Sequence, residues 1–167
     1  MKQCLITLRK GMNTFLSVVA AVLLSFMTLL VLYQVFTRYV LNNPAAFTEE
    51  LVRYCLMWTG FVGAAYAFST RQHMALVLVL EKLPDKSKRM LQAFIDLLIL
   101  LFALFVITIG GAKLALSAIH VYSALIGISR GLVYSVAPIC GVLIILAQCI
   151  NLYEDITGTK LEGGTTV

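Results

Sequence analysis

The stretch GMNTFLSVVAAVLLSFMTLLVLYQVFT at residues 11–37 contains 27 residues without a charged side chain. A helix of this length would be about 40 Å long, more than the roughly 30 Å hydrocarbon core of a bilayer. A cleaved signal peptide has an apolar region of only about 7–15 residues. We therefore interpret the stretch as a retained membrane-spanning helix that Arg38 closes at its far end.

The composition of the chain is typical of a membrane protein. Hydrophobic residues make up 60% of the 167 residues and charged residues 13%, whereas soluble domains contain roughly 25% charged residues. The net charge of +5 fits the excess of Lys and Arg on the cytoplasmic side of membrane proteins. No basic stretch interleaved with aromatic residues indicates binding of nucleic acid.

Three further charge-poor stretches predict three more spans. The second is expected to begin near Asn43 and Pro44, since Asn caps helices and Pro suits their first position. The third contains one charge, Asp96, and the fourth contains Pro138. The four expected spans are residues 11–37, 46–70, 90–112 and 131–153. The fold class is therefore all-α, an integral membrane bundle of four tilted helices in a single domain, residues 1–167.

The connections between the spans are predicted less sharply. Residues 74–80 are apolar but too few to cross a bilayer, so we expect an interfacial amphipathic segment between helices two and three, or else the frayed end of helix two. Residues 113–130 mix apolar and polar side chains, and either a helix or a loop is compatible with them.

Basic residues are distributed unequally between the two sides of the predicted bundle. With the N-terminus inside, nine of them lie on the inner side and four on the outer side, which predicts cytoplasmic N- and C-termini. The inner residues are Lys2, Arg9, Lys10, Arg71, Lys82, Lys86, Lys88, Arg89 and Lys160, and the outer residues are Arg38, Arg53, Lys113 and Arg130.

Polar side chains within the expected spans are too few for a transport site or an enzyme. Asp96 could bind a coupling ion, although a structural role beside an Arg or a neighbouring subunit is the preferred interpretation. His73 and His120 are expected at opposite ends of the bundle, so they cannot share a haem. The four cysteines lack metal-ligand spacing, and Cys140 and Cys149 are expected on opposite sides of one helix. We expect no enzymatic activity, cofactor or metal.

Small residues in two of the spans indicate close helix packing. Gly60 and Gly63 are each followed four residues later by Ala, and Ala137 is followed by Gly141, a spacing that lets helices approach closely. These pairs could contact a partner subunit or the chain's own helices. Trp58, the single tryptophan, could likewise form a subunit contact, face lipid or pack within the bundle.

Several short motifs are arranged as in a known family. They are RYVLN at residues 38–42, EEL at 49–51, WTGFVGAA at 58–65 and RQH at 71–73. Leu83 and Pro84 before the third span and Pro138 in the fourth complete a similar layout. In these features the whole chain resembles the small membrane subunit of tripartite ATP-independent periplasmic (TRAP) transporters, most densely over residues 31–84.

The resemblance implies a subunit of the bacterial inner membrane. Its partners would be a large membrane subunit, a periplasmic substrate-binding protein and membrane lipids. The chain would be a non-catalytic scaffold for sodium-coupled import of an organic acid such as a dicarboxylate or sialic acid. The alternative is a membrane anchor or assembly subunit of an unrelated inner-membrane complex.

Four charged residues that fall on one side of the membrane are expected to act together. An ion-pair network fixing the first two helices is the preferred role of Arg38, Glu49, Glu50 and Arg53, with docking of the binding protein or a solvated rim as alternatives. The candidate residues for a subunit interface or an interhelix network are Arg38, Glu49, Glu50, Arg53, Trp58, Gly60, Gly63 and His73.

Overall fold

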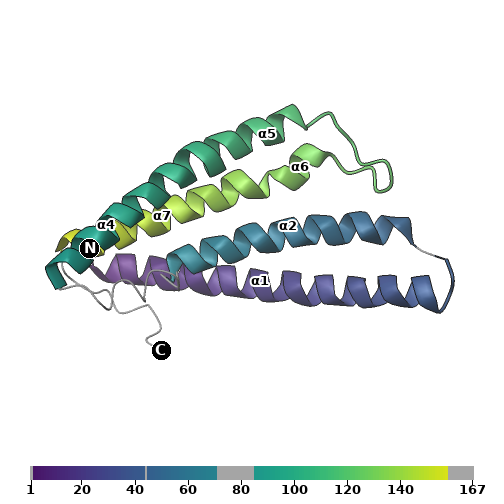
Figure 1. Cartoon of the computed structure of the whole chain (residues 1–167), viewed down its shortest axis with the longest axis horizontal. Helices are drawn as coiled ribbons and strands as arrows, with labels where there is room; N and C mark the ends of the chain where they lie inside the picture. The colour runs from purple at the N-terminus through teal and green to yellow at the C-terminus, as the bar shows by residue number, and fades with distance from the viewer. Residues whose placement is uncertain (1, 44, 71–84, 158–167) are drawn as a thin grey trace.

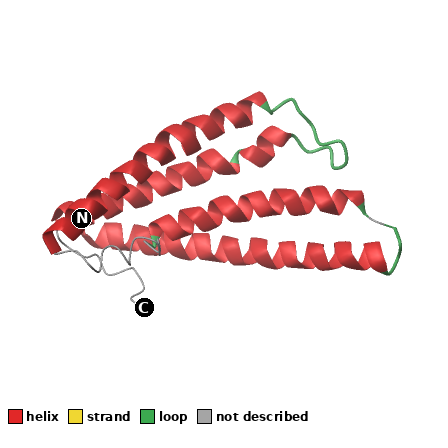
Figure 2. Ribbon diagram, viewed as in Figure 1, coloured by secondary structure: helices red, strands yellow, loops and turns green. Residues whose placement is uncertain are grey.

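The computed structural model describes residues 2–43, 45–70 and 85–157, and these residues form a helical bundle (Figure 2). The helical elements are α1 (Lys2–Tyr39), α2 (Ala46–Ser69), α4 (Asp85–Phe102), η1 (Ala103–Gly110), α5 (Gly111–Ser117), α6 (Arg130–Tyr134) and α7 (Val136–Thr157). Within this described part, four helical segments are long and apolar enough to cross a membrane: Ile6–Tyr39, Ala46–Ser69, Leu91–Ser117 and Arg130–Glu154. The all-α class and the expected number of four spanning helices are thus confirmed. The predicted interfacial segment at residues 74–80 lies outside the described residues.

Two helical hairpins make up the bundle (Figure 1). One consists of α1 and α2, and the other consists of the continuous rod α4–η1–α5 packed against α6 and α7. The hairpins lie close together at the end that carries the N-terminus and diverge toward the opposite end (Figure 1). Contacts between α2 and α7 join them. We call the first end the narrow end and the second the wide end.

The N-cap of helix two differs from the sequence prediction. The helix begins at Ala46, and its N-cap is Ala45, which makes no side-chain capping bond. The predicted cap at Asn43 is therefore wrong. Asn42 adopts a positive φ of 50°, a conformation that Asn tolerates better than most residues. The chain thus uses this stretch to turn from α1 into α2.

The undecided stretch at residues 113–130 contains both helix and loop. The third rod continues to Ser117, and a loop with one isolated bridge between Tyr122 and Ser129 follows it. The fourth span begins at Arg130 and is interrupted at Ser135. Pro138 has no N–H to donate to the carbonyl four residues earlier, which accounts for a break in that turn.

Small residues let the third and fourth spans pack closely. A Cβ atom added to Gly131 would lie 2.6 Å from the carbonyl oxygen of Ala115, and one added to Gly111 would lie 2.9 Å from the Cβ of Ala137. An added Cβ at Gly141 would collide with the Thr108 hydroxyl. The small pair Ala137 and Gly141 therefore serves packing within this chain.

The buried core lies where the hairpins meet. Its members come from all four spans: Leu16, Val62, Ala65, Ala103, Val136, Cys140 and Ile144. Cys140 is buried and Cys149 is exposed, as their nine-residue spacing predicts. Many large apolar side chains, including Phe15, Leu29 and Phe105, face outward. Such outward faces suit contact with lipid or with another membrane subunit.

Candidate functional site

The predicted charged group at the wide end divides into two separate contacts. Arg38 on α1 forms a salt bridge of 2.8 Å with Glu49 on α2, and each side chain is 51% exposed. Gln34 also donates a hydrogen bond of 3.4 Å to Glu49. An ion pair this exposed is worth at most about 1 kcal/mol, so it guides the packing of α1 against α2 without dominating it.

Glu50 points to different partners. It accepts one hydrogen bond from Ser123 in the loop before α6 and another of 2.6 Å from Tyr54 one turn further along α2. Arg53 and Arg130 lie near enough to act on its charge. Glu50 therefore connects α2 to the second hairpin, and it takes no part in the contact between Arg38 and Glu49.

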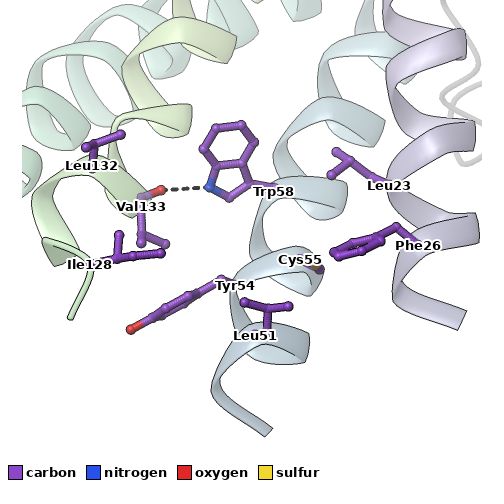
Figure 3. Close-up of a pocket in the computed structure, with 9 residues that line it drawn as sticks. All are labelled: Leu23, Phe26, Leu51, Tyr54, Cys55, Trp58, Ile128, Leu132 and Val133. Carbon is purple, nitrogen blue, oxygen red and sulfur yellow. Dashed lines mark hydrogen bonds between the residues drawn. The ribbon is translucent and has the colours of Figure 1, made fainter. Parts of the chain in front are cut away.

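Trp58 forms a direct link between the two hairpins. Its indole nitrogen donates a hydrogen bond of 3.0 Å to the carbonyl oxygen of Val133 on α6 (Figure 3). The indole N–H is therefore satisfied within the chain, whereas the ring lines an apolar crevice beside Leu23 and Leu132. Of the three interpretations of Trp58, packing within the bundle is the one that explains the hydrogen bond of its indole N–H.

Gly60 and Gly63 differ from the glycines of the other hairpin. A Cβ atom added to either would meet nothing within 4 Å, so no neighbour among the residues that the structure describes requires glycine there. This open space on α2 is compatible with the close approach of a helix from another subunit.

Two candidate residues remain, and the structure describes one of them. His73 lies outside the described residues. Asp96 on α4 is only 8% exposed, and it has an interaction partner. Its burial fits a structural role within the bundle. In the part of the chain that is described, no three His, Cys, Asp or Glu side chains converge as metal ligands would.

A buried polar cluster at the narrow end was not predicted from the sequence. The guanidinium of Arg9 on α1 donates to both carboxylate oxygens of Glu154 on α7, at 2.9 and 3.0 Å. It also donates to the backbone carbonyl of Ser69 at the end of α2, at 3.1 Å. Arg9 is 4% exposed and Glu154 is 8% exposed. One guanidinium therefore joins three helices.

Neighbouring amides and hydroxyls extend this cluster. Ser69 donates its hydroxyl to the side-chain oxygen of Asn13, and Asn151 donates to the carbonyl oxygen of Phe68, at 3.3 Å. We refer to Arg9, Asn13, Ser69, Asn151 and Glu154 as the narrow-end cluster. The backbone carbonyls of Phe68 and Ser69, in the last turn of α2, accept two of these hydrogen bonds. The helix itself provides no N–H donor for carbonyls at its C-terminal end.

The sequence contains a pattern of polar residues that could have predicted this cluster, but hydropathy alone does not reveal it. Arg9 and Glu154 each lie just outside a charge-free run, so they were assigned to the flanks. Asn13 follows Arg9 by four residues, and Asn151 precedes Glu154 by three, so each pair shares a helix face. Two polar faces at the same predicted end of the bundle could have indicated a contact.

Comparisons with known proteins agree with the architecture. Residues 27–158 match the family of tripartite ATP-independent periplasmic transporters, DctQ component. A Haemophilus influenzae protein named as a TRAP transporter small permease is 29% identical over 132 residues, which cover 79% of this chain and 81% of the relative. The sialic acid TRAP transporter small permease protein SiaQ of Vibrio cholerae is 26% identical over 147 residues, with coverages of 88% and 84%.

A third relative is much longer than this chain. It is the sialic acid TRAP transporter permease protein SiaT of Haemophilus influenzae, which is 25% identical over 122 residues. The aligned residues make up 71% of this chain but only 20% of that permease. A segment similar to this chain is thus one part of a larger membrane polypeptide.

Removing one member of the buried ion pair should destabilise the bundle strongly. For Arg9→Met or Glu154→Gln we expect the free energy of unfolding to fall by about 3–5 kcal/mol, because the remaining residue of the pair would be a buried charge without a counter-charge. Arg38→Gln, the matched control in the exposed pair, should cost at most about 1 kcal/mol. Unfolding of the purified protein in detergent by denaturant measures both. Equal losses for Arg9→Met and Arg38→Gln would contradict a structural role of the cluster.

Proposed function

This chain belongs to the family of DctQ components of TRAP transporters, and from that membership we propose that it is a scaffold for a large membrane subunit. The family is a transporter component, so the chain is not an enzyme. The proposed task is mechanical: the chain enlarges the fixed part of a complex against which a substrate-carrying part moves.

The distribution of polar groups supports the scaffold function most directly. Arg9 and Glu154 lie within or at the end of candidate spans and bind each other and a backbone carbonyl. A carrier would place polar groups where they could bind substrate or ions near the bilayer midplane. In this chain the buried charges near a helix end are used to hold helices together, as a rigid support requires.

The proposed partner is the large permease subunit. A relative named as a permease contains a segment similar to this chain, and that segment is a fifth of its length. In that relative, the segment similar to this chain is covalently joined to the rest of the permease. This supports a lasting association between this chain and a large permease subunit. Gly60 and Gly63, whose surroundings within this chain are open, are the positions at which we place this contact.

The transported compound is proposed to be an organic acid. The Vibrio cholerae relative is named for sialic acid, and the family resemblance includes dicarboxylates. We propose that uptake is coupled to sodium and that a periplasmic binding protein delivers the substrate, with recognition in those partners. The nine-to-four distribution of basic residues supports an inner-membrane location with both termini in the cytoplasm.

Reconstitution tests the scaffold function. Vesicles containing only this chain should take up no sialic acid or dicarboxylate under a sodium gradient, because the chain supplies support and no transport site. Vesicles that also contain the large subunit and are given the binding protein should take up substrate. Sodium-driven uptake by the purified small chain would remove the scaffold interpretation.

Reporter fusions test the proposed orientation. A fusion after Asp85 should report the cytoplasm, and a fusion after Tyr122 should report the periplasm, because basic residues are retained on the inner side. The expression level of each fusion serves as its control. Reversed signals would show that the basic asymmetry does not orient this chain.

A double substitution tests the proposed contact at α2. Gly60→Leu with Gly63→Leu should insert normally but weaken binding of the large subunit, because overpacking at a close contact costs about 1–3 kcal/mol, or roughly 5- to 150-fold in affinity. Gly11→Leu is the matched control, since its added Cβ also meets nothing within 4 Å. Detergent pull-down and uptake measure the loss.

Two results would contradict this contact. Full complex yield with the double variant would place the subunit interface on another face. Failure of the variant to accumulate in the membrane would show that these glycines serve the fold of the chain itself.

A further inference from the structure

The connection between α5 and α6 is apolar although it is exposed. We call residues 118–129 the wide-end loop. Neither this loop nor the turn before it, which together make up residues 114–129, contains Asp, Glu, Lys or Arg. Four large side chains of the loop are between 45% and 63% exposed: Ile119, Val121, Tyr122 and Leu125. Loops in water are usually polar, so this composition indicates less polar surroundings.

Polar groups of the wide-end loop bond within the chain. Ser123 donates its hydroxyl to Glu50, and its backbone N–H donates to the carbonyl oxygen of Ile128 at 2.9 Å. Ser129 donates its hydroxyl to the carbonyl oxygen of Ile119 at 2.6 Å. A polar group that is already bonded costs less to remove from water. A lipid-exposed loop does not lie in the hydrocarbon core, but these bonds suit it to the boundary between headgroups and acyl chains.

The contacts of the loop place it at the level where the charge-free run of α1 ends. Ser123 reaches Glu50 on α2, and the neighbouring Glu49 pairs with Arg38 at 2.8 Å. Arg38 directly follows the charge-free residues 11–37. Figure 1 shows the loop between α5 and α6 ending short of the turn that joins α1 to α2. The loop therefore lies beside the end of a membrane span and does not project far beyond it.

We propose that the wide-end loop inserts its exposed apolar side chains into the lipid surface, at the boundary between headgroups and acyl chains. Tyrosine, here Tyr122, is enriched at this level of membrane proteins. The charged residues that flank the apolar stretch, Lys113 and Arg130, are both positive and exposed. Their charge suits the phosphate groups and anionic lipids of a membrane surface.

The level of the loop favours lipid over a soluble partner. A soluble protein would dock beyond the ends of the spans, whereas the wide-end loop lies beside the start of α2. A second membrane subunit could reach the same level, and its binding would displace lipid from the loop. The proposal requires only that the chain spans a bilayer, so it holds whether or not the chain supports a transporter.

A tryptophan placed in the loop measures its depth. The full chain with Leu125→Trp is reconstituted in vesicles of phosphatidylcholine that is brominated at successive positions along its acyl chains. Bromine quenches tryptophan at short range, and the signal of Trp58, measured in the unaltered chain, is subtracted. We expect the new tryptophan to lie about 5–10 Å inside the boundary between headgroups and acyl chains and to be shielded from aqueous iodide.

Matched variants control for the preference of tryptophan itself. Asn43→Trp places the same side chain at an exposed position in the turn after α1, where it should lie farther out and be quenched by iodide. Tyr122→Trp, a conservative change at a residue that is 63% exposed, should repeat the depth found at position 125. Circular dichroism of each variant checks that the fold is retained.

The complex distinguishes lipid from a membrane partner. The Leu125→Trp chain is labelled with 5-hydroxytryptophan, which can be excited apart from ordinary tryptophan, and is combined with the large subunit and the binding protein in the same vesicles. We expect quenching by brominated lipid to persist, because the loop contacts lipid in the complex as well.

Three results would overturn the proposal. Quenching of the Leu125→Trp chain by iodide and not by brominated lipid would place the loop in water. Equal depths at positions 125 and 43 would show that tryptophan, and not the loop, determines the depth. Loss of lipid quenching on addition of the large subunit would show that the loop is a protein contact.

Discussion

The contact of Arg9 with Glu154 and with the carbonyl of Ser69 holds three helices at one end of the bundle. A charge in or near the hydrocarbon region is costly unless it is paired. The two hairpins therefore gain most by meeting where both charges and the open end of α2 can satisfy one another. Away from this point, the described residues that connect the hairpins include Trp58 and Glu50, together with apolar packing, and the helices diverge (Figure 1). The polar end thus fixes the geometry that leaves a crevice at the other.

The four helices follow from sequence because the bilayer imposes a simple condition. Each crossing needs about 20 apolar residues with internally bonded backbone, and charge-free runs reveal such segments directly. The exact ends of the helices are harder to predict, because the requirement for apolar residues no longer applies outside the lipid. Helix two begins at Ala46 without a side-chain cap, and the third rod extends to Ser117 past its predicted end. Neither hydropathy nor capping residues determine those positions.

Contacts between distant parts of the chain were predictable only in part. The sequence predicts that Arg38 and Glu49 lie on the same side of the membrane, and the structure pairs them. The same reasoning grouped Glu50 with them, but its partner Ser123 comes from a loop whose position depends on how the hairpins pack. Arg9 and Glu154 were missed because hydropathy treats charges near span ends as flanks. Their burial results from tertiary packing, which a count of charges along the chain does not contain.

Glycines in the two hairpins illustrate why a spacing motif alone does not identify an interface. Gly131 and Gly141 have neighbours so close that a Cβ would collide with them, whereas Gly60 and Gly63 face open space. The small-residue spacing is the same in Gly60 and Gly141, yet one hairpin already uses its close contact and the other does not. Glycine destabilises a helix because it has no Cβ atom and its backbone is freer in the unfolded chain. At Gly60 and Gly63 no described neighbour compensates for that cost. The contact that we propose between α2 and another subunit would give these two glycines a neighbour that requires them.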